Sequence, residues 1–178
     1  MIDCIDLDVG FYRKKYDDLN HFNDRKLARH YSQYGYYEGR ECNPYCLREK
    51  LTVLCNDKRV LEIGPFTTPQ LKGDTVSYAD VLNTDDLIKR ARDIGFSTQD
   101  IPIIDYVIDN LSLSKIATRF ECVFSSHNIE HQPDLISHLQ EVYNLLSDKG
   151  RYYLVVPHCS FCFDATLPPT KISEIFNA

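Results

Sequence analysis

Short apolar runs alternate with amphipathic segments beyond residue 58. Five of these runs are β-prone and bounded by turn-forming residues, so we expect strands there. They cover Arg59–Ile63, Thr75–Tyr78, Ile103–Ile108, Glu121–Ser125 and Arg151–Val156. The clearest helical pattern covers Asp134–Leu146, where apolar positions share one face between Pro133 and Gly150. This alternation predicts an α/β fold in which helices cover both faces of a parallel sheet of about five strands.

The first fifty residues have a different composition from the rest. They hold nine of the 21 aromatic residues of the chain. Apolar positions recur at helical spacing from Leu27 to Tyr34, after a helix cap at Asn23 or Asp24 and before Gly35. This pattern predicts a short amphipathic helix.

We therefore divide the chain into a small aromatic-rich helical module, residues 1–50, and an α/β domain, residues 51–178. In the module we expect the tyrosines to pack two or three short helices together. The alternative is that they form a surface that stacks on sugars or docks a protein, since a tyrosine ring has an apolar face and a polar tip.

The charge and hydropathy of the chain argue against several classes of function. Lys and Arg number 20 against 26 Asp and Glu, which gives a net charge of −6 and no general attraction to nucleic acid. No apolar run reaches the ~18 residues that span a bilayer, and the acidic start does not resemble a signal peptide. We expect a cytoplasmic protein with no nucleic-acid partner and no membrane span.

Seven cysteines without a secretory signal indicate reduced thiols. Two close pairs, Cys42 with Cys46 and Cys159 with Cys162, have a spacing from which a four-thiolate zinc site could be built. The second pair follows an apolar strand and has phenylalanine neighbours instead of knuckle-forming glycines, which disfavours zinc. We expect free thiols that are buried or partly buried.

His127, Glu130 and His131 have the spacing of an inverted zinc-peptidase motif. Zinc binding by this motif requires both imidazoles to face one way on a continuous helix. The residues before His127 are typical of the end of a strand, and the next helix starts only after Pro133. We therefore expect no metal and assign these histidines to a loop.

Ligands bind to open parallel sheets at the carboxyl ends of the strands, so the residues that follow the predicted strands are the candidate site. The first strand leads into Gly64, a single glycine where a dinucleotide site has three, and Pro65 lacks a backbone donor that a pyrophosphate needs. A nucleoside with an amino-acid tail needs fewer glycines and backbone donors than a dinucleotide does. It needs close approach at Gly64, a carboxylate such as Glu62 for its ammonium group, directly or through water, and Asp80 for the ribose hydroxyls.

Five segments, taken in order, resemble the class I S-adenosylmethionine-dependent methyltransferases, and among them the type 11 group. They are Leu-Glu-Ile-Gly-Pro (61–65), Tyr-Ala-Asp-Val (78–81), Ile-Asp-Tyr-Val-Ile-Asp-Asn (104–110), Phe-Ser-Ser-His-Asn-Ile-Glu-His (124–131) and Leu-Ser-Asp-Lys-Gly-Arg-Tyr-Tyr-Leu-Val-Val-Pro (146–157). The resemblance extends from Val60 to Pro157 and more weakly to Thr170, and so covers well over half of the chain.

The resemblance implies a Rossmann-like sheet, S-adenosyl-L-methionine as cofactor, and roles for the residues after each strand. It assigns Glu62, Gly64 and Phe66 to the cofactor loop, Asp80 to the ribose, Asp109 and Asn110 to the adenine edge, and Ser126 with His127 to the floor beside the sulfonium. A hydroxyl acceptor loses a proton as it attacks, and a histidine is the usual base. His127 and His131 are the catalytic candidates, and His158 ends a strand at the same edge. The alternative is that these histidines only close the loop by hydrogen bonds.

The segment Phe11–Arg40 resembles a small helical module found beside bacterial and viral glycosyltransferases and glycan-modifying enzymes. This second resemblance implies a glycan context for the chain. The expected methyl acceptor is accordingly a hydroxyl of a small molecule or a glycan.

The chain departs from the methyltransferase pattern after the fifth strand. Only 22 residues follow Val156, fewer than the helix and the closing antiparallel hairpin of that family need, and Ala165 and Leu167 stand where the family has a histidine and an arginine after Asp164. The alternative function is therefore a non-catalytic binding module with the cofactor fold, or a part of a larger glycan-modifying protein. With the hairpin missing, the outer edge of strand five is expected to be uncovered and to cause self-association.

Overall fold

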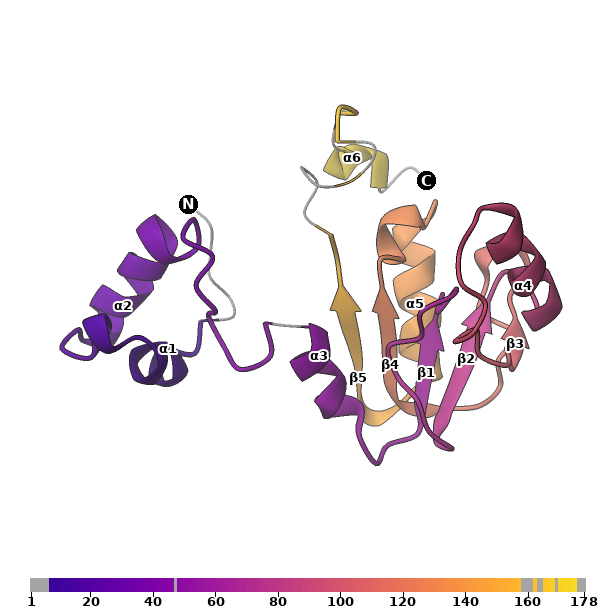
Figure 1. Cartoon of the computed structure of the whole chain (residues 1–178), viewed down its shortest axis with the longest axis horizontal. Coiled ribbons are helices and arrows are strands. Elements are labelled where there is room, and N and C mark those ends of the chain that lie inside the picture. Colours follow the sequence, from indigo (N-terminus) through magenta and orange to yellow (C-terminus); the bar gives the residue numbers. More distant parts are fainter. Residues whose placement is uncertain (1–6, 47, 158–161, 163–164, 169, 176–178) are drawn as a thin grey trace. The chain divides into compact units, whose positions relative to one another are not determined.

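The computed structural model describes residues 7–46, 48–157, 162, 165–168 and 170–175 (Figure 1). The chain divides into two compact units, Met1–Leu54 and Cys55–Ala178, which we call the amino-terminal and carboxy-terminal units. The division follows Leu54, a few residues after the boundary expected at residue 50. Each unit has a buried apolar core of its own.

The carboxy-terminal unit contains, in its described part, a five-stranded sheet in which every paired strand is parallel. The strands are β1 (Val60–Ile63), β2 (Val76–Asp80), β3 (Tyr106–Val107), β4 (Phe120–Ser126) and β5 (Leu146–Val155). Their order is β3-β2-β1-β4-β5, which Figure 1 shows as arrows pointing the same way. The sheet confirms the α/β, Rossmann-like fold predicted from the sequence.

Two strands differ clearly from their predicted bounds: β5 begins five residues before the predicted Arg151, at Leu146, and the third strand is shorter than predicted. Of the predicted strand Ile103–Ile108, only β3 (Tyr106–Val107) pairs with β2. The Asp105 amide still donates to the Tyr78 carbonyl of β2 at 3.0 Å, but the Ile104 amide before it donates to the side chain of Thr84, to Oγ1 at 2.9 Å. The sequence pattern could not distinguish these apolar residues from a longer strand.

Among its described residues, the carboxy-terminal unit has two longer helices and one short helix beside the sheet. They are α4 (Thr84–Asp93), α5 (Leu135–Leu145) and α6 (Ile172–Ile175). The side chains of Asn83 and Asp134 cap α4 and α5 by accepting backbone amides in the first turn. The core combines α5 with the strands and contains Leu61, Ile63, Ala79, Ile108, Leu113, Ile116, Phe120, Val123, Val142 and Leu145. No helix in the described residues is long and apolar enough to cross a membrane.

The connection from β1 to β2, residues 64–75, contains no helix. Hydrogen bonds to β2 hold this loop: the Gly64 amide donates to the Ala79 carbonyl at 2.8 Å, and the Tyr78 hydroxyl donates to the Leu71 carbonyl at 2.6 Å. A crossover between parallel strands usually carries a helix. This loop, which we call the β1–β2 loop, replaces that helix at the carboxyl edge of the sheet.

The amino-terminal unit is built from short helical segments. They are α1 (Val9–Lys15), α2 (Asp24–His30) and α3 (Arg48–Leu51), the 3₁₀ turns η1 (Asp17–Leu19) and η3 (Thr52–Cys55), which crosses the unit boundary, and the π-helical turn η2 (Tyr31–Gly35). Tyr12 is fully buried, and its ring meets those of Tyr16 and Tyr31 edge-on at 5.0 and 5.4 Å. These tyrosines pack the helices together. Tyr34 and Tyr37 are exposed, so a sugar-stacking or docking role stays a prediction for them.

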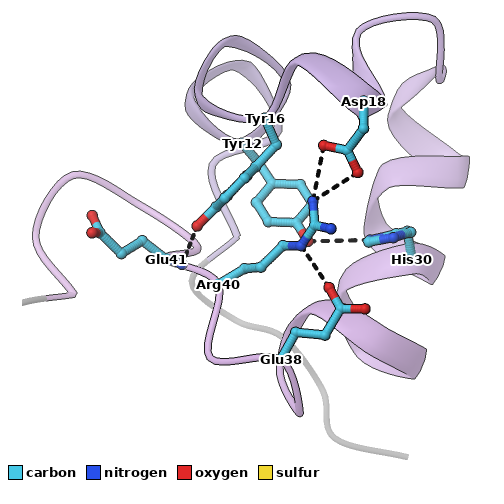
Figure 2. Close-up of polar contacts among 7 residues, drawn as sticks. All are labelled: Tyr12, Tyr16, Asp18, His30, Glu38, Arg40 and Glu41. Carbon is cyan, nitrogen blue, oxygen red and sulfur yellow. Dashed lines mark hydrogen bonds and ion pairs between the residues drawn. The ribbon is translucent and has the colours of Figure 1, made fainter.

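Arg40 connects the segment after η2 to the turn η1 by hydrogen bonds (Figure 2). Its Nη1 donates to both carboxylate oxygens of Asp18 at 3.1 and 3.0 Å, and its Nε donates to Glu38 at 2.6 Å. The guanidinium group also lies over the Tyr16 ring, 4.8 Å from its centroid. A planar, permanently charged group suits this combination of bidentate and stacking contacts. Arg40 therefore has a structural role in the unit.

Candidate functional site

The sheet reverses its direction of growth between β1 and β4. From β1 the chain adds β2 and β3 on one side, whereas β4 and β5 lie on the other. Ile63 and Ser125 are partners in the ladder, so the segments that follow them begin side by side. Such a switch point is the usual ligand site of an open α/β sheet. The predicted cofactor loop and the predicted histidine loop thus meet at one edge.

Gly64 turns the chain away from β1 in a conformation that favours glycine. Its φ is +70°, and a Cβ at this position would lie 2.6 Å from Asn128 Nδ2. The Asn128 side chain is held in turn by Gln132, whose Nε2 donates to Asn128 Oδ1 at 3.0 Å. Both the backbone and a neighbouring side chain therefore require glycine here. Asn128 was not among the predicted site residues, because only its position in the fold brings it over Gly64.

Glu62 lies on β1 and is 1% exposed. Its two carboxylate oxygens accept the backbone amides of Gln70 at 2.8 Å and Leu71 at 3.0 Å. Burial raises the pKa of this carboxyl group to about 7, although the two amides lower it. These bonds hold the β1–β2 loop against the sheet. A contact of Glu62 with the ammonium group of a ligand, directly or through water, stays a prediction.

Asp80 is the last residue of β2 and is 7% exposed. Its Oδ1 accepts the Leu82 amide at 3.2 Å. Burial raises the pKa of this carboxyl group, whereas the backbone amides of Leu82, Phe66 and Val81 lower it. The Phe66 amide thus links the loop after β1 to the end of β2. This carboxylate lies at the carboxyl end of β2, and its contact with a ribose stays a prediction.

Phe66 has a φ of +44°, which is unusual for a large side chain and indicates that its surroundings impose the conformation. Its ring lies 5.9 Å from that of Phe96, with the two planes tilted by 57°. Phe96 follows α4 and is 56% exposed. The two rings form an aromatic surface next to the β1–β2 loop. The sequence pattern did not indicate Phe96 as a site residue, because its partner Phe66 is thirty residues away in the chain.

Asp109 and Asn110 follow β3 at the same edge as Asp80. The Ile108 amide donates to the Asp80 carbonyl at 2.9 Å, which holds this segment beside β2. Both side chains are exposed. Asp109 pairs with Lys115, and this contact lowers the pKa of its carboxyl group. The structure therefore brings the two residues to the predicted edge, and their contact with an adenine stays a prediction.

The imidazoles of His127 and His131 both lie near the carboxylate of Glu130 in the loop after β4. His127 Nδ1 and His131 Nε2 each lie 4.0 Å from Glu130 Oε1, and the two imidazole side chains are 54% and 58% exposed. The His127 amide donates to the Val155 carbonyl at 2.9 Å, so the loop is also fixed to β5. Ser126 is the last residue of β4 and is half-buried. The structure thus brings the two candidate bases together at the switch point.

The histidine loop does not have the backbone of a zinc-peptidase site. His127 follows β4 with a left-handed φ of +52°, and Glu130 and His131 belong to the 3₁₀ turn η5 (Ile129–His131), so no continuous helix carries both imidazoles. Among the residues that the structure describes, no group of three or more His, Cys, Asp or Glu side chains is placed to hold a metal ion. Three positions named from the sequence lie outside the described residues: His158, Cys159 and Asp164.

A cavity of about 390 Å³ opens beside the histidine loop. We call it the η5 cavity; it is lined by Ile129, Glu130, Gln132, Pro133, Leu135, Thr170, Glu174 and Ile175. Glu130 therefore belongs both to the histidine cluster and to the cavity wall. Another cavity, of about 400 Å³, lies at the start of β5 between Arg119 and Lys149. That one is at the opposite end of the strands, away from the candidate site.

A buried polar chain lies beneath the site and joins β4, β5 and α5. The Tyr152 hydroxyl is 2.9 Å from Ser125 Oγ and 3.0 Å from His138 Nε2. His138 is 4% exposed, and burial lowers its pKa. The neutral imidazole is therefore favoured, and this chain supports the strands from which the histidine loop starts.

Comparisons with known proteins give a fold likeness alone. No known family model and no curated protein matches the sequence. A solved structure from Galdieria sulphuraria, assigned as a sarcosine dimethylglycine methyltransferase, is similar at 14% sequence identity and a TM-score of 0.40. The similar region covers 78% of this chain and 51% of that chain, so this chain spans about half the length of that structure. We take no site residue or activity from this likeness.

Proposed function

We propose that the carboxy-terminal unit binds S-adenosylmethionine and transfers its methyl group to a hydroxyl of a small molecule or a glycan. The observation that supports this most strongly is the convergence of three strand ends at the switch point. They contribute the left-handed turn at Gly64, the buried carboxylate of Asp80, and the loop with His127 and His131. A nucleoside with a charged tail needs close backbone approach and a ribose-binding acid at these places.

The cofactor would supply a methyl group on a sulfonium, and in-line transfer of that group needs no metal. The chain has two tasks in this reaction. It aligns the acceptor at the carboxyl edge, and it takes the hydroxyl proton on the imidazole of His127 or His131. Glu130, 4.0 Å from each imidazole, would stabilise the positive charge that the ring gains.

A second candidate is a binding module without turnover, and the β1–β2 loop favours it. The loop contains no helix, so no helix N-terminus at this place can bind an anionic tail of the ligand. Both Glu62 oxygens are also engaged by this loop. Incubation with methyl-labelled cofactor and candidate acceptors distinguishes the two functions, because a binding module would hold the cofactor and release no demethylated product.

Calorimetric titration of the full chain with S-adenosylmethionine and with its demethylated product tests the binding step. We expect Asp80→Ala to weaken binding by about 1.5–3 kcal/mol, since a buried, charged hydrogen bond is lost. Asp80→Asn is the milder variant, and Asp93→Asn on the exposed end of α4 is the matched control. Equal affinity of the wild type and the Asp80 variants, at unchanged thermal stability, would remove Asp80 from the site. No binding by the wild-type chain would refute the proposed function.

A further inference from the structure

We propose that the η5 cavity is the acceptor site and that it selects acceptors carrying a protonated amine beside their hydroxyl groups, as an amino sugar does. The role of the cavity as an acceptor site rests on the proposed methyl transfer. The choice of a cationic ligand rests on the walls of the cavity and is independent of that reaction.

The charged side chains among the described residues that line the cavity are both acidic. Glu130 and Glu174 contribute carboxylates, and no Lys or Arg is among the described residues that line the cavity. The side chain of Glu130 is 23% exposed, so solvent screens it only in part. Such walls attract an ammonium group and repel a carboxylate or a phosphate. Anionic sugars and nucleotides are therefore disfavoured as acceptors.

The remaining walls suit a small polyhydroxylated ring. Apolar contacts come from Ile129, Leu135 and Ile175, and polar groups come from Gln132 and Thr170. Apolar surface can cover the C–H face of a ring, while the amide and the hydroxyl bond to its substituents. A volume of about 390 Å³ is that of a site for a small molecule.

Two contacts connect the cavity to the reaction centre. Gln132 lines the cavity and donates to Asn128, whose amide lies against Gly64. Glu130 lines the cavity and lies 4.0 Å from the imidazoles of His127 and His131. An ammonium group held by Glu130 would therefore bring the neighbouring hydroxyls of the same ring toward these bases.

The transfer itself balances without a further reactant. The hydroxyl oxygen forms a bond to the methyl carbon while the carbon–sulfur bond breaks and its electron pair stays on sulfur. The hydroxyl proton passes to the imidazole nitrogen. The charge of the sulfonium is thus replaced by that of the imidazolium, and the ammonium group of the acceptor takes no part in the bond changes.

Titration of the full chain with three sugars tests the charge selection. Glucosamine is cationic below the pKa of its amine, N-acetylglucosamine is neutral and glucuronate is anionic. In the presence of the demethylated cofactor, we expect glucosamine to bind about tenfold more tightly than N-acetylglucosamine and glucuronate to bind least. The preference should shrink as the salt concentration rises, because salt screens a partly exposed charge pair.

The variants Glu130→Gln and Glu174→Gln test whether these two carboxylates cause the preference for a cationic sugar. Glu174 accepts the Lys171 amide at 2.7 Å, and glutamine keeps an acceptor for that bond. Each variant should lose about threefold to tenfold in affinity for glucosamine with little change for N-acetylglucosamine, whereas Asp93→Asn should change neither. If the cofactor binds but glucosamine shows no preference, or a preference that both variants retain, the inference is overturned. If the preference is present and depends on both glutamates but no cofactor binds, the cavity selects cations and the proposed methyl transfer is wrong.

Discussion

At the scale of single residues, Gly64 is under two constraints that substitution can separate. A left-handed φ of +70° costs an alanine about 1 kcal/mol, and its Cβ would also overlap Asn128. We expect Gly64→Ala to lower the free energy of unfolding by about 2–4 kcal/mol, measured by chemical denaturation. In an Asn128→Ala background the loss should fall to the backbone part, about 1 kcal/mol. An equal loss in both backgrounds would show that the Asn128 contact does not constrain the turn.

Glu62 gives the unfolding free energy a specific pH dependence. Its pKa is raised from 4.5 to about 7 in the folded chain, so the folded state binds the proton more tightly than the unfolded state. The stabilisation from protonated Glu62 is fully present below pH 4.5 and is lost as the pH rises through about 7. The shift corresponds to about 3 kcal/mol, because one pKa unit is worth about 1.4 kcal/mol.

Denaturation of the wild type and of Glu62→Gln across this pH range tests the expectation. The variant should be less stable at every pH, because its amide NH₂ faces backbone donors of the β1–β2 loop, and it should lack the decline between pH 4.5 and 7. Parallel curves for the two proteins would contradict the assigned protonation of Glu62.

At the scale of elements, the π-helical turn η2 depends on Gly35. A Cβ there would overlap the Tyr12 hydroxyl and crowd the Tyr31 ring. We expect Gly35→Ala to destabilise the amino-terminal unit by about 1–3 kcal/mol, measured as loss of its helical signal on heating. Tyr12→Phe should recover part of this loss by removing the hydroxyl, although it also removes the 3.1 Å contact of that hydroxyl with His30. Gly39→Ala is the control for backbone strain without a steric clash: its Cβ would have open space, but its φ of +68° costs an alanine about 1 kcal/mol, a loss that Tyr12→Phe should not relieve.

At the scale of the whole molecule, the outer edge of β5 predicts that copies of this chain associate with one another. In the described part of the chain, β5 pairs with β4 and with no strand on its other side. Unpaired backbone groups along a ten-residue strand are a template for another chain. We expect light scattering at micromolar concentration to show a dimer or a larger species, and the β5 amides to exchange more slowly as the concentration rises. A monomer whose β5 exchange does not depend on concentration would exclude this edge as an interface.

The sequence by itself determined the fold class and the edge at which the candidate residues gather. Periodicity indicates which residues are buried, and in a parallel sheet every strand ends on the same side, so Gly64, Asp80 and His127 could be placed at one edge from the sequence alone. The cap of α2 could be predicted for the same local reason, since the Asn23 side chain accepts the Lys26 amide within the first turn of its own helix.

Tertiary structure alone decided which side chains meet. Asn128 lies over Gly64, Glu62 is bonded to the β1–β2 loop, and Phe96 reaches Phe66, and each of these contacts depends on distances across the fold that no local pattern encodes. The short β3 has the same explanation, because a hydrogen bond from Ile104 to Thr84 competes with strand pairing. A strand-end pattern specifies an edge of the sheet, whereas the geometry of a site also depends on side chains brought there from distant parts of the chain.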